Sequence, residues 1–408
     1  MNILEISHNY HVAGGSDAVF FATTKLLRQN GHHVVPFCID SPKNRQTHWA
    51  RYFPRGANTG AKPVRDTLRY FHNAEAARNL ARLIQDHGPF DVAHLHIYHG
   101  KQTPAILPVL RRFGIRIVHT LHEYKLACPT YTMQRNGAPC DLCVSHGSVN
   151  ALKHRCKDGS LAQSAVMVAE YHAARIRGDV RMVDRFLCVS GFQRQVMEKA
   201  GLPRQKLRVL HNFVEEQPDI GPPQPDAPLL YFGRIEKLKG LGTLLSAMRH
   251  TDRKLVIAGH GGWQQQMQAQ ISDMPNVTYA GFQSGAALEQ LIKTARAVIV
   301  PSEWYENCPM SVLEAKAFGR PVIGARIGGI PELIRDGRDG FLFEPGNADD
   351  LGAALAKLNS GSGDIMYRNA RLDIANRFSA HRHLGALTGH FAEIQTRPSL
   401  RPLAEAPA

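Results

Sequence analysis

The sequence predicts an α/β protein built from two doubly wound, Rossmann-like domains, and three observations carry this prediction. The chain has 408 residues, which is enough for two domains of ordinary size. Short runs of β-branched and other apolar residues, typical of buried parallel strands, alternate with helical segments in both halves. Between the halves, Glu215–Pro228 contains five prolines and four acidic residues without apolar periodicity, so we expect a linker there.

The first half begins with a β-loop-α-β unit. The expected elements are a strand at Asn2–Ser7, a loop over His8–Gly15, a helix at Ser16–Asn30 and a strand at His33–Ile39. Gly14 and Gly15 stand at the start of the helix, where a phosphate could approach the backbone; a simple tight turn is the alternative. The pair does not form G-x-G-x-x-G, so the sequence does not predict a nicotinamide cofactor.

The rest of the first half continues this alternation of strands and helices. Strands are expected at Phe90–Ile97, Ile115–Leu121, Arg185–Ser190 and Lys206–Val214, with a helix between the first two and helices at Leu161–Arg177 and Gly191–Ala200. Ligands of open parallel sheets bind beyond the carboxyl ends of the strands. His122 directly follows a strand and falls where such ligands bind; a histidine that only satisfies loop backbone is the alternative.

The second half repeats the pattern after the linker. Strands are expected at Leu229–Phe232, Lys254–Ala258, Val277–Ala280, Ala297–Val300 and Pro321–Ala325. Helices are expected at Gly285–Ala295, from Pro309 to about Gly319, at Ala348–Leu358, at Met366–Phe378 and at His381–Ile394. The tail Gln395–Ala408 is rich in proline and alanine and is expected to be loose.

The helix that Pro309 opens offers an anion site. Free amides and the positive end of the helix dipole gather at a helix N-terminus, where a diphosphate would fit. Glu306 lies just before it and can accept hydrogen bonds from sugar hydroxyls, while Glu314 lies about a turn and a half inside the helix and can reach a ribose. Arg234 and Lys239 carry charges suited to phosphate oxygens. Spacing alone does not distinguish these residues from surface charges.

The surrounding motifs favour the ligand site. The runs E-N-C-P-M-S-V-L-E-A, G-R-P-V-I, G-G-I-P-E-L-I and D-G-F-L-F, with G-R-I-E-K-L-K-G upstream, occur in this order in the second half. Together they closely resemble the donor-binding signature of family-4 retaining glycosyltransferases of the GT-B fold. Weaker likeness extends to the N-terminus, so the resemblance covers most of Met1–Asn376.

The resemblance implies two Rossmann-like domains that face a central cleft. Residues 1–214 would form the acceptor-side domain, 215–228 the linker and 229–380 the nucleotide-sugar donor domain, and the helix in 381–408 would cross back to the first domain. The implied enzyme is a retaining hexosyl- or glycosyltransferase. It would move a sugar from a nucleotide-diphosphate donor, expected to be a UDP- or GDP-sugar, to a hydroxyl of a glycan or lipid-linked glycan. No Asp-x-Asp occurs, so we expect no divalent metal on the diphosphate.

The resemblance also assigns the site residues. Arg234 and Lys239 would hold the diphosphate and stabilise its charge as it leaves, by preorganised electrostatics. Glu306 would orient the sugar hydroxyls, without being assigned as a covalent nucleophile, and Glu314 would anchor the ribose. His122 would lie near the transferred sugar and the acceptor. The remaining donor contacts are expected from Gly14, Gly15, Asn307, Cys308, Pro309 and Met310, with the base near 259–261 and 281–284.

An insertion at about 123–160 contains four of the seven cysteines. Cys128, Cys140, Cys143 and Cys156 form C-x11-C-x2-C-x12-C in a polar, basic segment. Four thiolates could hold a structural zinc, but a strong zinc signature has two C-x2-C knuckles and this one has one. An iron–sulfur cluster and unligated thiols are the alternatives. The odd count and the absence of an evident signal peptide favour a reducing cytoplasm.

The positive charge is concentrated in the first half. Residues 1–212 hold 29 Lys and Arg against 14 Asp and Glu, whereas the remainder holds 20 against 21. This asymmetry indicates a polyanionic partner such as nucleic acid, anionic lipid or a phosphorylated acceptor, the alternative being solubility. The aromatic and basic segment His48–Asn73 could lie on a membrane, stack on bases or pack into the core.

Two other functions compete with sugar transfer. A nucleic-acid-binding protein with a zinc loop would explain the charge, but no RNP-type or helix-turn-helix signature is present, so we expect no nucleic acid partner. A nucleotide-sugar epimerase on the same architecture is the second alternative. No run reaches the roughly 20 apolar residues that span a bilayer. We therefore expect a cytoplasmic enzyme that binds peripherally to the anionic face of the cytoplasmic membrane.

Overall fold

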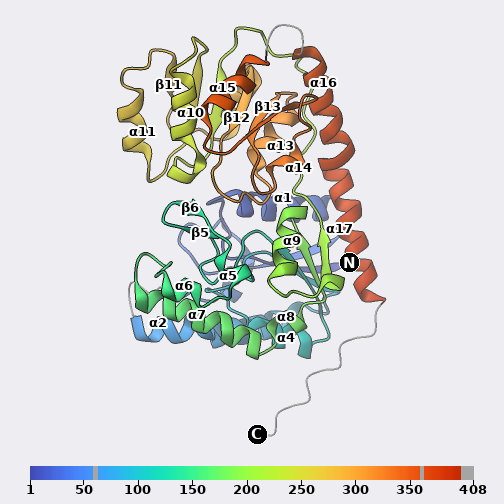
Figure 1. The fold of residues 1–408 in the computed structure, drawn as a ribbon. Coiled ribbons are helices and arrows are strands. Elements are labelled where there is room, and N and C mark those ends of the chain that lie inside the picture. Colours follow the sequence, from blue (N-terminus) through green and yellow to red (C-terminus); the bar gives the residue numbers. More distant parts are fainter. Residues whose placement is uncertain (58–62, 359–362, 397–408) are drawn as a thin grey trace.

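The computed structural model of the chain, which describes residues 1–57, 63–358 and 363–396, confirms the predicted α/β class (Figure 1). It contains two six-stranded sheets, and all strand pairs within each sheet are parallel. The first sheet lies in the N-terminal half of the chain and the second in the C-terminal half, one above the other in Figure 1. Within the described residues, no helix is both long and apolar enough to cross a lipid bilayer.

The first sheet has the strand order β2-β1-β3-β4-β7-β8. Its strands are β1 (Asn2–Ile6), β2 (His33–Phe37), β3 (Val92–Leu95), β4 (Arg116–Leu121), β7 (Arg185–Cys188) and β8 (Leu207–Val209). The ends of β1, β2 and β3 are in register, since Ile6 pairs with both Phe37 and Leu95. The segments that follow these strands therefore emerge together at one edge of the sheet, toward the second domain.

The first sheet is flanked by α1 (Gly15–Gln29), α2 (Pro63–Phe71), α3 (Ala74–His87), α4 (Ile106–Arg112), α7 (Leu161–Ile176), α8 (Asp179–Met182) and α9 (Gly191–Lys199). The carboxylate of Asp17 fixes the start of α1 by accepting hydrogen bonds from the backbone N–H of Ala13 at 3.0 Å and of Gly14 at 3.1 Å. At α9, the N-cap Ser190 accepts from the backbone N–H of Gln193 at 3.1 Å.

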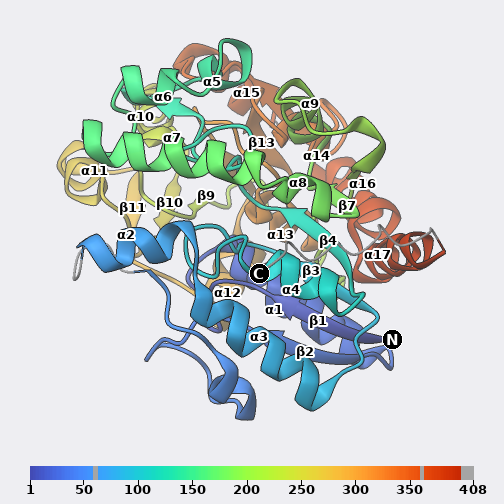
Figure 2. The ribbon, with the colours of Figure 1, turned by 90° about the horizontal axis from the view of Figure 1, so that it is seen from below.

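The insertion forms a small layer beside α7 (Figure 2). It consists of the short strands β5 (Gln134–Arg135) and β6 (Ala138–Pro139) and the short helices α5 (Leu142–Ser145) and α6 (Asn150–Lys153). The helix α6 packs against α7, and α5 packs against α9. The strands β5 and β6 lie at the level between the two sheets in Figure 1.

The second sheet has the strand order β11-β10-β9-β12-β13-β14. Its strands are β9 (Leu229–Phe232), β10 (Leu255–Ala258), β11 (Val277–Tyr279), β12 (Ala297–Val300), β13 (Val322–Ala325) and β14 (Gly340–Phe343). Its helices are α10 (Leu241–Met248), α11 (Gln264–Ile271), α12 (Gly285–Thr294), α13 (Met310–Ala317), α14 (Ile330–Leu333), α15 (Ala348–Ala356) and α16 (Gly363–Asp373). The runs Ala297–Val300 and Val322–Ala325 are fully buried, as expected for central parallel strands.

The chain crosses between the domains twice. Residues 215–228 contain no helix or strand and lead into the second domain. After a π-helical turn at Ile374–Phe378, helix α17 (Ala380–Gln395) runs back along the first domain (Figure 1). Its Leu387 and Phe391 are fully buried in a cluster with Ile3 and other residues of the first sheet.

Some local expectations differ from the structure. The strand expected at Lys206–Val214 ends at Val209, because the following residues serve the domain boundary: the Asn212 side-chain amide donates to the Cys308 carbonyl at 3.1 Å, and Val214 pairs with Ser379. Helix α3 was not placed from the sequence. The expected loose tail lies, from residue 397 on, outside the described residues.

The aromatic and basic segment is part of the core for the most part. Trp49, Tyr52 and Phe53 are 8%, 2% and 5% exposed and belong to the main cluster of the first domain. A membrane or nucleic-acid contact through these three rings is therefore wrong, and the core alternative holds for them.

Candidate active site

The carboxyl ends of the second sheet carry the segments that the sequence singled out. The segment Gly233–Gly240 follows β9, Pro301–Pro309 follows β12 and Arg326–Gly329 follows β13. Because β9, β12 and β13 are adjacent parallel strands, these three segments emerge at the same edge of the sheet. This edge faces the first domain in Figure 1.

Glu306 is held in a charged cluster at this edge. Lys239 pairs directly with Oε1 of Glu306, and the Ser302 hydroxyl donates to the same oxygen at 2.6 Å. Burial acts to raise the pKa of Glu306, but Lys239, Ser302 and the nearby Arg234 outweigh it and hold the pKa below its ordinary value. Glu306 is therefore an ionised acceptor at neutral pH.

Arg234 and Lys239 both lie near one aromatic ring. The Arg234 guanidinium is 5.9 Å from the ring centre of Trp304, and the Lys239 ammonium is 5.7 Å from the same ring. The Arg234 residue is exposed, whereas Lys239 is half-buried. Glu306, Arg234 and Lys239, three of the predicted catalytic residues, are thus brought together in one site.

Two glycines fix the geometry of this cluster. Gly240 has φ +74°, and a Cβ there would lie 1.7 Å from the Pro301 carbonyl oxygen, so the short turn that carries Lys239 packs directly on the segment after β12. Gly328 has φ +60°, and its Cβ would lie 2.4 Å from the Glu306 carbonyl oxygen. The next residue, Gly329, donates its backbone N–H to that same oxygen at 2.7 Å.

Helix α13 meets the glycine pair of the first domain. A Cβ on Gly15 would lie 3.9 Å from Cγ of Met310, the first residue of α13, while the space next to Gly14 is open. The two helix N-termini of α1 and α13 therefore approach each other across the domain boundary. Glu314, on α13, is half-buried and has no side-chain partner among the described residues. Burial raises the pKa of Glu314 to about 7.

Asn307 and Cys308 connect the donor-side segment to the first domain through hydrogen bonds. The Asn307 side-chain amide donates to the His122 carbonyl at 2.9 Å. The Cys308 carbonyl accepts a hydrogen bond from Asn212. The Cys308 side chain is 6% exposed and lies in an apolar cluster of the second domain. Burial raises the pKa of the Cys308 thiol to about 12, so only the backbone of Cys308 is available to a ligand.

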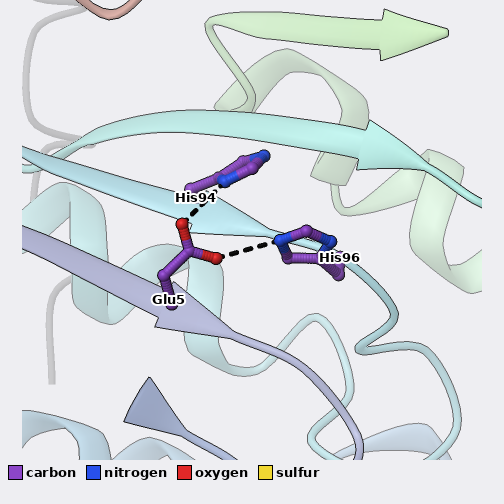
Figure 3. A group of neighbouring side chains, drawn as sticks. All are labelled: Glu5, His94 and His96. Carbon is purple, nitrogen blue, oxygen red and sulfur yellow. Dashed lines mark hydrogen bonds and ion pairs between the residues drawn. The ribbon is translucent and has the colours of Figure 1, made fainter. Parts of the chain in front are cut away.

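His122 directly follows β4, and its ring contacts a buried cluster of histidines. Its ring stacks on His96, with 5.1 Å between the ring centres and an angle of 6° between the planes. Behind His96, the carboxylate of Glu5 binds both His94 and His96 (Figure 3). Sequence reasoning missed these three residues. The available signal was H-x-H in one strand, which places both rings on one face, beside a strand that holds a glutamate.

Glu332 is a further residue whose role the sequence did not reveal. It lies on α14 of the second domain, yet its carboxylate accepts hydrogen bonds from the backbone N–H of Gly191 and of Phe192, both at 2.7 Å, at the start of α9. His211 lies 3.0 Å from the same carboxylate. Glu332 therefore caps a helix of the other domain and joins the two domains.

The four cysteines of the insertion lie near one another. A hydrogen bond from Cys143 lowers the pKa of Cys128 to about 6 despite its burial, so these two thiols are in contact. Within the described ranges, however, the one set of three potential ligands whose donor atoms lie within 4.8 Å of one another is Glu5, His94 and His96. A tetrahedral zinc site holds four sulfurs at about 2.3 Å from one ion, closer together than these thiols lie, and the zinc stays a prediction.

Comparisons with known proteins cover both domains. The family model described as glycosyl transferases group 1 matches residues 213–373, and the model described as glycosyltransferase family 4 matches residues 13–217. An uncharacterised glycosyltransferase of Methanocaldococcus jannaschii is 30% identical over 202 residues, which are 43% of this chain and about half (51%) of that protein's length. The D-inositol 3-phosphate glycosyltransferase of Stackebrandtia nassauensis is 25% identical over 337 residues, covering 79% of this chain and 72% of that protein.

The fold is also shared with solved structures. The crystal structure of HepE from Anabaena in complex with UDP superposes with a TM-score of 0.67 over 96% of this chain and 100% of that chain. The sequence identity is 17%, so this likeness concerns the architecture of the two domains.

Proposed function

The chain belongs to the group 1, family 4 glycosyltransferases, which have the GT-B fold, and from this premise we propose that it uses a nucleotide-diphosphate-sugar donor. The proposed reaction transfers the sugar to an acceptor hydroxyl with retention at the anomeric carbon and without a divalent metal. The observation that carries the proposal is the pairing of Glu306 with Lys239 beside Arg234, where α13 begins opposite Gly15.

The diphosphate would lie between the two domains. Arg234 and Lys239 offer fixed positive charge, and the N-terminal amides of α13 and α1 offer hydrogen-bond donors from both sides. Charge develops on the diphosphate as it leaves, and donors that are already in place stabilise it without reorganisation. These groups would do the work for which other transferases recruit a metal ion.

The sugar would lie against Glu306. Because this carboxylate is ionised, it accepts hydrogen bonds from sugar hydroxyls and does not donate a proton. Its negative charge next to the ring would also favour an oxocarbenium-like centre. Glu314, eight residues after Glu306 and without a side-chain partner among the described residues, would bind the ribose hydroxyls.

The base would lie beyond β10 and β11. His260 and Phe282 follow these two strands and form an edge-to-face pair with 4.9 Å between ring centres. Phe282 is 62% exposed, an unusual position for a large apolar ring and one suited to stacking on a base. We propose UDP as the first nucleotide to test, since HepE was solved with UDP and with UDP-glucose.

We propose that the acceptor is a glycan or lipid-linked glycan presented at an anionic membrane. The apolar side chains of Leu68, Val149 and Leu161 are 69%, 61% and 53% exposed on or next to α2, α6 and α7, which pack together. The cations Lys153 and Arg155 are exposed on the same insertion. Mixed apolar and basic side chains on one face favour anionic lipid surfaces. Absence of binding to phosphatidylglycerol vesicles would contradict this part of the proposal.

A thermal-shift panel of UDP-, GDP-, ADP- and TDP-sugars identifies the donor, because a ligand that binds the native state raises its melting temperature. Transfer by the identified donor is then measured for Glu306→Ala, Arg234→Ala and Lys239→Ala, and we expect all three folded variants to be inactive. Lys237→Ala is the matched control, because this exposed lysine lies in the same turn as Lys239. Full activity of the three variants would refute the proposal.

The two alternative functions are less well supported. The two family models that match residues 13–217 and 213–373 both describe glycosyltransferases, so neither supports a nucleic-acid-binding role. An epimerase would convert the donor sugar without an acceptor, so product analysis in the absence of acceptor distinguishes it from a transferase.

A further inference from the structure

A chain of hydrogen bonds lies behind His122 and begins at the fully buried carboxylate of Glu5. Glu5 of β1 contacts Nδ1 of His94 through Oε1 and Nε2 of His96 through Oε2, both at 2.9 Å (Figure 3). His94 lies on β3 and His96 directly follows that strand, and all three residues are at most 1% exposed. The chain continues from Nδ1 of His96 to Nε2 of His122 at 2.8 Å.

The charge on Glu5 determines which nitrogens carry protons. Burial acts to raise the pKa of Glu5, but His94 and His96 outweigh it and lower the pKa to about 2. An ionised carboxylate accepts hydrogen bonds and cannot donate them. The two nitrogens that face Glu5, Nδ1 of His94 and Nε2 of His96, must therefore be protonated.

The same reasoning extends to His122. Burial lowers the pKa of His96, so its ring is neutral and its second nitrogen, Nδ1, is an acceptor. The contact between His96 and His122 then requires the proton on Nε2 of His122. At the other end, the Thr120 hydroxyl lies 2.7 Å from Nε2 of His94 and donates to it when that ring carries its one proton on Nδ1, which gives each hydrogen bond of the chain one donor and one acceptor.

We propose that Glu5, acting through His96, fixes His122 as the tautomer protonated on Nε2, so that Nδ1 of His122 presents a hydrogen-bond acceptor to a substrate hydroxyl. Nδ1 of His122 has no partner among the described residues. The position of His122 beside the donor segment is set by Asn307, which binds its carbonyl. Glu5 and His96 are positioning residues, and the inference about substrate rests on the proposed function.

A metal ion is the competing reading of Glu5, His94 and His96, because their donor atoms lie within 4.8 Å of one another. Each of these atoms already takes part in a hydrogen bond within the trio, and solvent does not reach them. A metal would have to displace the protons of both imidazoles. The hydrogen-bond chain already gives each of these nitrogen and oxygen atoms a partner, without a metal.

The tautomer is measured directly in the full-length protein without substrate. Long-range ¹H–¹⁵N correlation on uniformly ¹⁵N-labelled protein identifies the protonated nitrogen of each histidine, and His122→Asn assigns the His122 signals. We expect His122 to be protonated on Nε2. A proton on Nδ1, or a stoichiometric metal ion bound by Glu5, His94 and His96, would overturn the proposal.

Two variants test the role of the chain. Glu5→Gln introduces an amide that donates where the carboxylate accepted, and His96→Phe keeps a ring against Phe20 but removes both nitrogens. We expect His122 to become a mixture of tautomers in both. Thr120→Val is the matched control, because it disturbs the opposite end of the chain and leaves the His122 tautomer unchanged. A single Nε2-protonated tautomer in both variants would refute the inference.

A kinetic readout separates positioning from mere stability. With UDP-glucose as the probe, we expect kcat/KM for its turnover to fall about tenfold in Glu5→Gln, which corresponds to one hydrogen bond of roughly 1.4 kcal/mol. Affinity for UDP alone should stay unchanged, because in the proposed site His122 faces the sugar and the acceptor and not the nucleotide. If the native protein turns over no sugar donor but shows the expected tautomer, the proposed function fails and the tautomer assignment stands.

Discussion

Replacement of Lys239 by methionine would leave the buried carboxylate of Glu306 without its main counter-charge. The side chains of Lys239 and Glu306 are only 19% and 11% exposed, so solvent screens the pair weakly. Removing one partner of a buried pair typically costs about 3–5 kcal/mol. Since Ser302 and Arg234 remain beside Glu306, we expect the lower end, about 3 kcal/mol, at neutral pH.

The loss should depend on pH in a defined direction. In the native protein the pKa of Glu306 is below its ordinary value of 4.5, so the pair stabilises the fold above that value and its contribution is lost as the pH falls through the lowered pKa. In Lys239→Met, burial dominates and raises the pKa of Glu306 above 4.5. The penalty is then full at pH 7.5 and much smaller near pH 4, where Glu306 of the variant is mostly protonated in both the folded and the unfolded chain.

Thermal unfolding at the two pH values measures this effect. For a domain of 150–250 residues, about 3 kcal/mol corresponds to a melting temperature lower by roughly 6–12 °C. We expect that decrease at pH 7.5, a much smaller one at pH 4, and recovery of most of the loss in Lys239→Met/Glu306→Gln. Lys237→Met serves as control. Equal losses for the single and double variants at both pH values would refute the reasoning.

Three further substitutions test other parts of the structure. Gly328→Ala places a Cβ about 2.4 Å from the Glu306 carbonyl oxygen, so the Glu306 segment should shift and donor affinity, measured by calorimetry, should fall; unchanged affinity would contradict this packing. Glu332→Ala removes the cap of α9 and should cost about 1–2 kcal/mol in urea unfolding, with a larger radius of gyration in X-ray scattering; an unchanged radius would show that Glu332 does not join the domains. Phe391→Ala should cost about 3–5 kcal/mol in urea unfolding, since its ring is fully buried against the first sheet; a loss below about 1 kcal/mol would contradict this docking.

The local sequence pattern was sufficient to predict most of the strands. The run Ala297–Val300 was predicted residue for residue, because a fully buried parallel strand is a short β-branched run with turn signals on both sides. The same rule extended the strand at Lys206–Val214 too far. Its apolar residues beyond Val209 are buried at the domain boundary, and a pattern of burial does not reveal what covers a residue.

The site depended on information that is not local. Glu306 and Lys239 are separated by 67 positions, and their proximity was suggested by the resemblance to a family, not by spacing. Glu5 and His94 could not be connected from the sequence, because their contact depends on the register of β1 against β3. Cys308 was predicted as a donor contact, but which face of a segment points inward depends on the tertiary packing.

The return of α17 makes the first domain discontinuous along the chain. Its sheet is covered on one side by residues that are synthesised only after the whole of the second domain. Until α17 has left the ribosome, an apolar surface around Ile3 and Val118 would be exposed to solvent. The N-terminal domain is thus completed after the C-terminal one. A chain that ends before Ala380 would contain both sheets but would be prone to aggregate and would depend on chaperones.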